Sequence, residues 1–153
     1  MNDYFSTLYV DLQKRIKAQV PDIKWIEQDF GQDVYDQWRP NVSFPAALID
    51  FPNTDYSMES TTSQMGEVTV VIRLLFAPFS QSYDKAPITV REKALKYFGL
   101  EQQLVNALHG WMPKDKYTQP FVRTNARSNN RNDIGLRIRE LTFTTLYEED
   151  FED

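Results

Sequence analysis

The run from Glu67 to Ala77 is the longest apolar, β-branched stretch of the chain, and it constrains the fold more than any other feature. Every second residue of this run lies on one face, and all side chains of that face are apolar. Most side chains of the other face are apolar too. A strand of this composition is at least partly covered on both faces. We therefore expect Glu67 to Ala77 to form the central strand of a sheet.

The natural partner of this strand is the run from Ile134 to Tyr147, which is long enough to span the whole sheet. Its apolar positions change phase, because one alternating set ends at Ile138 and the next begins at Leu141. One extra residue near Arg139 and Glu140 would bring both sets to the same face, so we expect a β-bulge there. The alternative is a strand that ends and restarts.

The remaining segments read as further helices and strands. Apolar residues recur every three or four positions from Tyr4 to Val20, which indicates an amphipathic helix that ends at Pro21. A second helix is expected to begin at Thr89, where Thr-Val-Arg-Glu has the spacing of a capping box, and to end near Gly110. Gly99 could kink this helix or split it. Further strands are expected at Ile23–Asp29, Phe44–Phe51 and Phe121–Ser128.

This order of elements, α-β-β-β-α-β-β, predicts an α+β fold. We expect a mostly antiparallel sheet of about five strands with two main helices packed on it. The 153 residues are enough for one well-buried core and few for two, so we expect a single domain over residues 1–153. An acidic C-terminal tail is expected at about residues 148–153.

Two long polar segments interrupt the pattern. The first, Gly31 to Ser43, carries Tyr35 and Trp38, and aromatic residues in a loop are candidate anchors on a partner. The alternative is that at least one of them folds back on the core. The second, Pro52 to Gly66, is expected to be a long loop, which in a compact domain is usually functional or disordered. Its large side chains are Tyr56, Met58 and Met65, and of these Tyr56 and Met58 are further candidates for partner contacts.

The charge of the chain is unevenly distributed along the sequence. Residues 114–139 hold seven basic and two acidic side chains, whereas residues 140–153 hold six acids and no base. Such polarity favours a subunit that meets the opposite charge of another subunit, although a solvated face with a frayed acidic tail is the alternative. The residues expected to pair across a subunit boundary are Arg123, Arg127, Arg137 and Arg139, with the acceptors Glu148, Glu149 and Asp150.

Residues suited to catalysis are scarce. The chain has no cysteine and one histidine, His109, at the expected end of a helix, and it has none of the common phosphate-binding, nucleophile or zinc motifs. Two pairs of carboxylates lie in expected loops and are interpreted as solvated: Asp33 with Asp36, and Asp50 with Asp55. We therefore expect no catalytic activity, no cofactor and no metal.

The composition also limits where the protein is expected to be located and which partners it is expected to bind. The apolar runs are too short to span a membrane, and the first residues do not resemble a signal peptide. Arg123, Arg127, Arg131, Arg137 and Arg139 could form the basic face of a small nucleic-acid-binding module. The overall net charge of −5 and the absence of a recognition motif count against direct binding.

The order of the segments resembles the small tail terminator and tail-completion proteins of long-tailed bacteriophages and related contractile injection particles. The resemblance covers nearly the whole chain. It rests on the N-terminal amphipathic helix, the Pro-Ala-Ala-Leu-Ile-Asp strand at 45–50, a polar segment leading into Glu-Val-Thr-Val-Val-Ile-Arg-Leu, the helix over 91–110, and a final arginine-bearing hairpin that ends in Leu-Tyr-Glu-Glu-Asp.

This resemblance implies a structural virion protein that forms a ring, commonly a hexamer. Such a ring stops tail-tube growth and offers a surface to the neck. The implied partners are tail tube or sheath protein and neck or connector proteins, with DNA at most passing through the ring lumen. The implied location is the tail or neck of a virion assembled in the bacterial cytoplasm. Head–tail connector proteins are the alternative.

Overall fold

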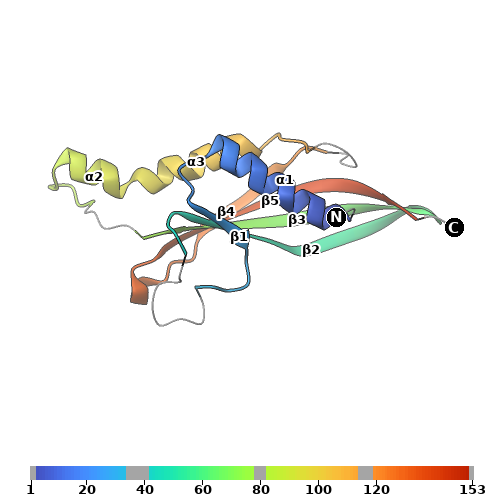
Figure 1. Cartoon of the computed structure of the whole chain (residues 1–153), viewed down its shortest axis with the longest axis horizontal. Coiled ribbons are helices and arrows are strands. Elements are labelled where there is room, and N and C mark those ends of the chain that lie inside the picture. Colours follow the sequence, from blue (N-terminus) through green and yellow to red (C-terminus); the bar gives the residue numbers. More distant parts are fainter. Residues whose placement is uncertain (1–2, 34–41, 78–81, 114–118, 152–153) are drawn as a thin grey trace.

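The computed structural model describes residues 3–33, 42–77, 82–113 and 119–151, and it shows a twisted sheet with helices along one face (Figure 1). The sheet has five strands in the order β1-β2-β3-β5-β4, so the predicted central strand is confirmed as β3. The elements are α1 (Tyr4–Gln19), β1 (Trp25–Gln28), β2 (Ala46–Ser60), β3 (Ser63–Phe76), α2 (Ile88–Ala94), α3 (Lys96–Leu108), β4 (Val122–Ser128), a 3₁₀ turn (Asn132–Ile134) and β5 (Arg137–Asp150).

The five-stranded sheet and two main helices, α1 and α3, were expected, whereas the order of elements differs slightly because a short additional helix, α2, precedes α3. The second predicted helix is two helices, α2 and α3, which meet at Leu95, four residues before Gly99. The predicted capping box is also absent. Pro87 is the residue that precedes α2, and Thr89 lies inside the helix. Gly110 follows the end of α3 with a φ of 83°, as expected for a glycine that terminates a helix.

The long β3–β5 pair is antiparallel and regular from Ser63, opposite Asp150, to Phe76, opposite Arg137. The predicted β-bulge near Arg139 and Glu140 is therefore wrong for this pair, and so is the alternative of a strand that restarts. A register shift lies instead in β4, between Arg123 and Asn125.

The phase change in β5 has a different cause, because the two faces of the sheet are covered at different places. Leu141, Phe143 and Tyr147 pack on the face that carries α1 and α3. Ile138 packs on the opposite face in a second, smaller cluster. The other buried members of that cluster are Ala46, Leu48, Leu75 and Leu136.

The larger core lies between the sheet and the helices. Asp3 caps the first helix, because its side chain accepts a hydrogen bond of 2.9 Å from the backbone N–H of Ser6. Three of the predicted apolar positions of α1, which are Leu8, Leu12 and Ile16, are fully buried. In the described part of the chain, no helix is both long and apolar enough to cross a membrane.

The predicted loop over Pro52 to Gly66 is instead the outer half of a long β-hairpin. Strands β2 and β3 pair as far as Ser60 and Ser63, with a register shift between Asp50 and Asn53. Pro52 falls at this shift, which is where a sheet tolerates a residue without an N–H donor. The outer half of β2 is mostly exposed, so its sequence lacks the apolar alternation by which strands are recognised.

Candidate interaction surfaces

A buried charge network lies on the sheet face opposite the helices. Arg73 projects from β3 and forms a two-pronged ion pair with Asp33, with Nη1–Oδ1 at 2.8 Å and Nη2–Oδ2 at 2.7 Å. Asp29 lies 3.4 Å and Glu140 lies 3.6 Å from the same guanidinium. The side chains of Arg73 and Asp33 are only 11% and 2% exposed. This bidentate geometry is the strongest form of such a pair.

The prediction that Asp33 is solvated was therefore wrong. Burial by itself raises the pKa of Asp33, but the hydrogen bonds and the charge of Arg73 outweigh burial and lower it below the ordinary value. Asp50 and Asp55 are exposed, as expected, and Asp36 lies outside the described residues. The signal for the network was Arg73 itself, because a cation in a strand covered on both faces needs a carboxylate partner.

The network joins segments that are far apart in the sequence. Arg131, in the β4–β5 connection, donates a hydrogen bond to the backbone carbonyl of Asp33 and pairs with Asp133 at 2.8 Å. Asn129 donates to Glu140 at 2.7 Å. The segment that ends at Asp33 is thus held against both β3 and the β4–β5 connection. Tyr35 and Trp38 follow in the sequence and lie outside the described residues.

Two of the four predicted interface arginines have ion-pair partners in their own chain. Arg127, which is 69% exposed, pairs with Glu140 at 2.9 Å. Arg139 pairs with Glu101 of α3. The proposal that these arginines pair across a subunit boundary stays a prediction, and in Arg139 such a contact would compete with the bond to Glu101.

The other two arginines lie apart from each other. Arg137 lies with its guanidinium 5.7 Å from the centre of the Tyr97 ring and donates to the Tyr97 hydroxyl at 3.3 Å. The backbone N–H of Arg123 donates to Nδ1 of His109 at 3.1 Å. A shallow hollow at this histidine is lined by Val105, Asn106, His109 and Arg123, without a carboxylate among the described residues.

The predicted acidic acceptors lie at the far end of the sheet. Glu148, Glu149 and Asp150 belong to the end of β5, and the backbone N–H of Phe151 donates to the carbonyl of Thr62 in the β2–β3 turn at 2.6 Å. Met58 is 75% exposed and Phe151 is 48% exposed at this end. We call Met58, Glu149, Asp150 and Phe151 the acidic tip.

A stack of tyrosines supports the acidic tip from behind. The rings of Tyr4 and Tyr147 are 3.7 Å apart and nearly parallel. The hydroxyl oxygens of Tyr56 and Tyr147 are 2.7 Å apart, and Tyr147 donates to Glu149 at 3.0 Å. Burial, followed by the bonds to Tyr56 and Glu149, raises the pKa of Tyr147. Gly66 makes room for the stack, because a Cβ there would lie 2.5 Å from the Tyr147 ring.

A groove of about 510 Å³ opens near the opposite end of the molecule, between the α2–α3 junction and the ends of the inner strands. Its apolar lining includes Phe44, Phe76, Leu95 and Leu100, and its charged lining consists of Lys24, Lys93, Lys96 and Asp22. We call this the lysine groove. No sequence pattern predicted it, because its residues come from four separate segments.

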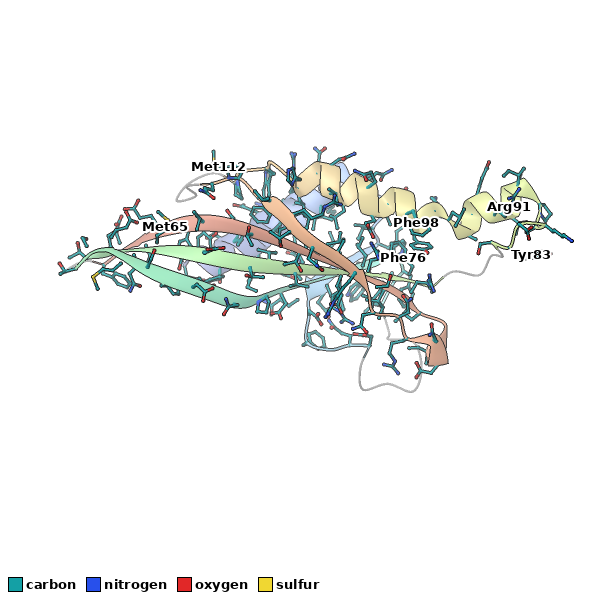
Figure 2. All side chains as sticks on the ribbon, turned by 180° about the vertical axis from the view of Figure 1, so that it is seen from behind. Met65, Phe76, Tyr83, Arg91, Phe98 and Met112 are labelled. Atoms are coloured by element: carbon teal, nitrogen blue, oxygen red, sulfur yellow. The ribbon has the colours of Figure 1, made fainter. Side chains whose placement is uncertain are left out.

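The described residues hold no group of three or more histidine, cysteine or acidic side chains placed to bind a metal ion. The features that stand out are instead surfaces: the acidic tip, the lysine groove and a row of exposed apolar side chains. Those near α2 and the start of α3 are Tyr83, Ile88, Leu95 and Phe98. Figure 2 shows Tyr83 and Arg91 at this end of the molecule and Met65 near the other.

Comparison with known proteins gives a likeness in structure only. No family model matches the chain, and no curated protein matches it. A chain from the solved structure "Virion of native gene transfer agent (GTA) particle" is similar in fold, with a TM-score of 0.51 over 97% of this chain and 99% of that chain. The two sequences are 12% identical, so the likeness shows the fold alone. It is a fold that occurs in a virion particle.

Proposed function

We propose that this chain is a structural protein of a phage-like virion. The observation that carries the proposal is the fold, which matches a chain of a gene transfer agent virion over nearly the full length of both chains. The surfaces support the same interpretation, since large apolar side chains are exposed at both ends of the molecule. Exposed apolar patches of this kind mark sites of contact with other proteins.

Within the virion, the proposed role is a ring, with six subunits as the working number, that ends the tail tube or sheath and presents a surface to the neck. Its partners are then further copies of itself and the adjoining tail and neck proteins. The alternative role is that of a head–tail connector. We further propose that the chain has no catalytic activity of its own.

The ring is tested by native mass spectrometry of the purified full-length protein, alone and with assembled tail tube. A single closed oligomer, formed alone or on the tube, is the expected result. A protein that stays monomeric under both conditions contradicts the ring.

The position in the particle is tested by removing the gene and imaging the particles. Tails of irregular length are expected if the protein ends tube growth. Tails of normal length that do not join heads support the connector role instead. Normal, complete particles contradict both roles.

A further inference from the structure

The two ends of this molecule carry opposite charge. Residues 53–67, which form the outer part of the β2–β3 hairpin, contain three acids and no lysine, arginine or histidine, and residues 143–151 at the end of β5 contain three acids and no base. Both segments run to the acidic tip. At the other end, residues 82–99 contain four basic and two acidic side chains.

These two ends lie far apart in one molecule. Figure 1 shows α2 at one extreme of the long axis and the β2–β3 turn with the C-terminal end of the chain at the other. The acidic tip of a subunit therefore does not reach the lysine groove of the same subunit. It can reach only the groove of another copy.

Shape and chemistry agree with the charges. The lysine groove offers an apolar floor of Phe44, which is partly buried, and of Phe76 and Leu100, which are buried, beside three exposed lysines. In the described part of the chain, none of these lysines pairs with a carboxylate. The groove volume of about 510 Å³ lies within the range of pockets that bury a small ligand, and is enough for large side chains such as those of Phe151 and Met58.

We infer that the acidic tip of one subunit docks in the lysine groove of the next. Phe151 and Met58 fill the apolar floor, while Glu149 and Asp150 meet Lys93 and Lys96. The contact joins two different surfaces, so an open row of subunits keeps one free tip at one end and one free groove at the other until it closes. A head-to-tail contact of this kind closes into a ring when its rotation allows, which is how the inference deepens the proposed ring function, on which it rests.

The test uses two variants of the full chain that each disable one surface. The tip variant carries Glu149→Ala and Phe151→Ala, and the groove variant carries Lys93→Glu and Lys96→Glu, so the altered tip has no attraction for the altered groove. Each variant alone should assemble at a concentration about tenfold or more above that of the wild type, because an aromatic anchor or a set of complementary charges is lost. A control variant changes two exposed lysines on α1, Lys14→Glu and Lys17→Glu, and should assemble normally.

Mixing the two variants gives the decisive result. The groove of the tip variant and the tip of the groove variant are both intact, so the equimolar mixture should form a one-to-one dimer and nothing larger. Native mass spectrometry distinguishes the outcomes, and circular dichroism of each variant checks that it is folded.

Three results overturn the inference. Variants that assemble like the wild type refute the docking contact but do not contradict the proposed ring. A mixture that forms full rings, or no dimer at all, excludes a head-to-tail contact between these surfaces. A wild type that remains monomeric with and without tail tube overturns the ring and the docking together.

Discussion

Replacing Arg73 by methionine should be among the most destabilising single changes in this chain. Methionine keeps much of the side-chain volume but removes the positive charge that lies between Asp29, Asp33 and Glu140. Removing one partner of a buried ion pair costs about 3–5 kcal/mol, because the remaining charge is left buried and uncompensated. Since domains are stable by only about 5–15 kcal/mol, we expect a large loss of the free energy of unfolding.

A matched control lies on the edge strand β4. Arg127 contacts the same Glu140, but its side chain is 69% exposed, whereas that of Arg73 is 11% exposed. An exposed ion pair contributes about 0–1 kcal/mol, so Arg127→Met should be nearly neutral. Urea titrations that follow tryptophan fluorescence measure both variants. A difference between the two variants below about 1 kcal/mol would refute the assignment of Arg73 as the centre of a buried network.

The effect of pH on the same comparison has a definite sign. The pKa of Asp33 lies below its ordinary value of 3.8, because Arg73 outweighs the effect of burial. A lowered pKa in the folded state stabilises the fold above pH 3.8, and that stabilisation is lost as the pH falls from there through the folded-state pKa. The difference in free energy of unfolding between the wild type and Arg73→Met should therefore be largest at neutral pH and should decrease below about pH 3.8. A gap that widens on acidification would contradict this cause.

The remaining predictions concern packing and use the same urea assay. Gly66→Ala should cost about 1–3 kcal/mol, because the new methyl group meets the stacked Tyr147 ring. Gly99→Ala should stabilise α3 by about 0.5–1 kcal/mol, because a methyl group there meets no neighbouring element within 4 Å. Equal effects of the two changes would contradict this packing. Leu12→Ala, at a fully buried position of α1, should cost about 2–5 kcal/mol, and a smaller loss would mean that α1 is loosely held. Tyr56→Phe removes one partner of the hydroxyl contact with Tyr147 and should cost about 0.5–1.5 kcal/mol, with no change expected if solvent replaces it fully.

Local patterns in the sequence were sufficient for the elements that pack on one core. The three- and four-residue spacing of Phe5, Leu8, Leu12 and Ile16 predicted α1, and the apolar run from Glu67 to Ala77 predicted the central strand. The turn-forming residues after Ser128 predicted the β4–β5 hairpin. For α1 and β3 the pattern is written in neighbouring residues because one face of the element is buried along its length, whereas the hairpin was indicated by residues that favour turns locally.

The same reasoning failed where covering differs along an element. Strand β5 keeps one register with β3, but its buried side chains lie on one face near its start and on the opposite face further along. This change of face gives the same sequence pattern as a bulge. The outer β2–β3 hairpin is largely exposed to solvent, so it resembles a loop in sequence although its two strands pair almost to the turn. Which face of a strand is buried depends on the positions of helices and strands that are distant in the sequence.

The candidate surfaces, too, could be predicted only in part from the sequence. Charge blocks along the chain, such as the acids from Glu140 onward, predicted that unlike surfaces would meet, since the sum of charges in a segment needs no fold. The pairing of Arg73 with Asp33 and the gathering of Lys24, Lys93 and Lys96 around one groove required the tertiary structure. Contacts between residues 40 or more positions apart arise from the topology of the sheet, and no local pattern records them.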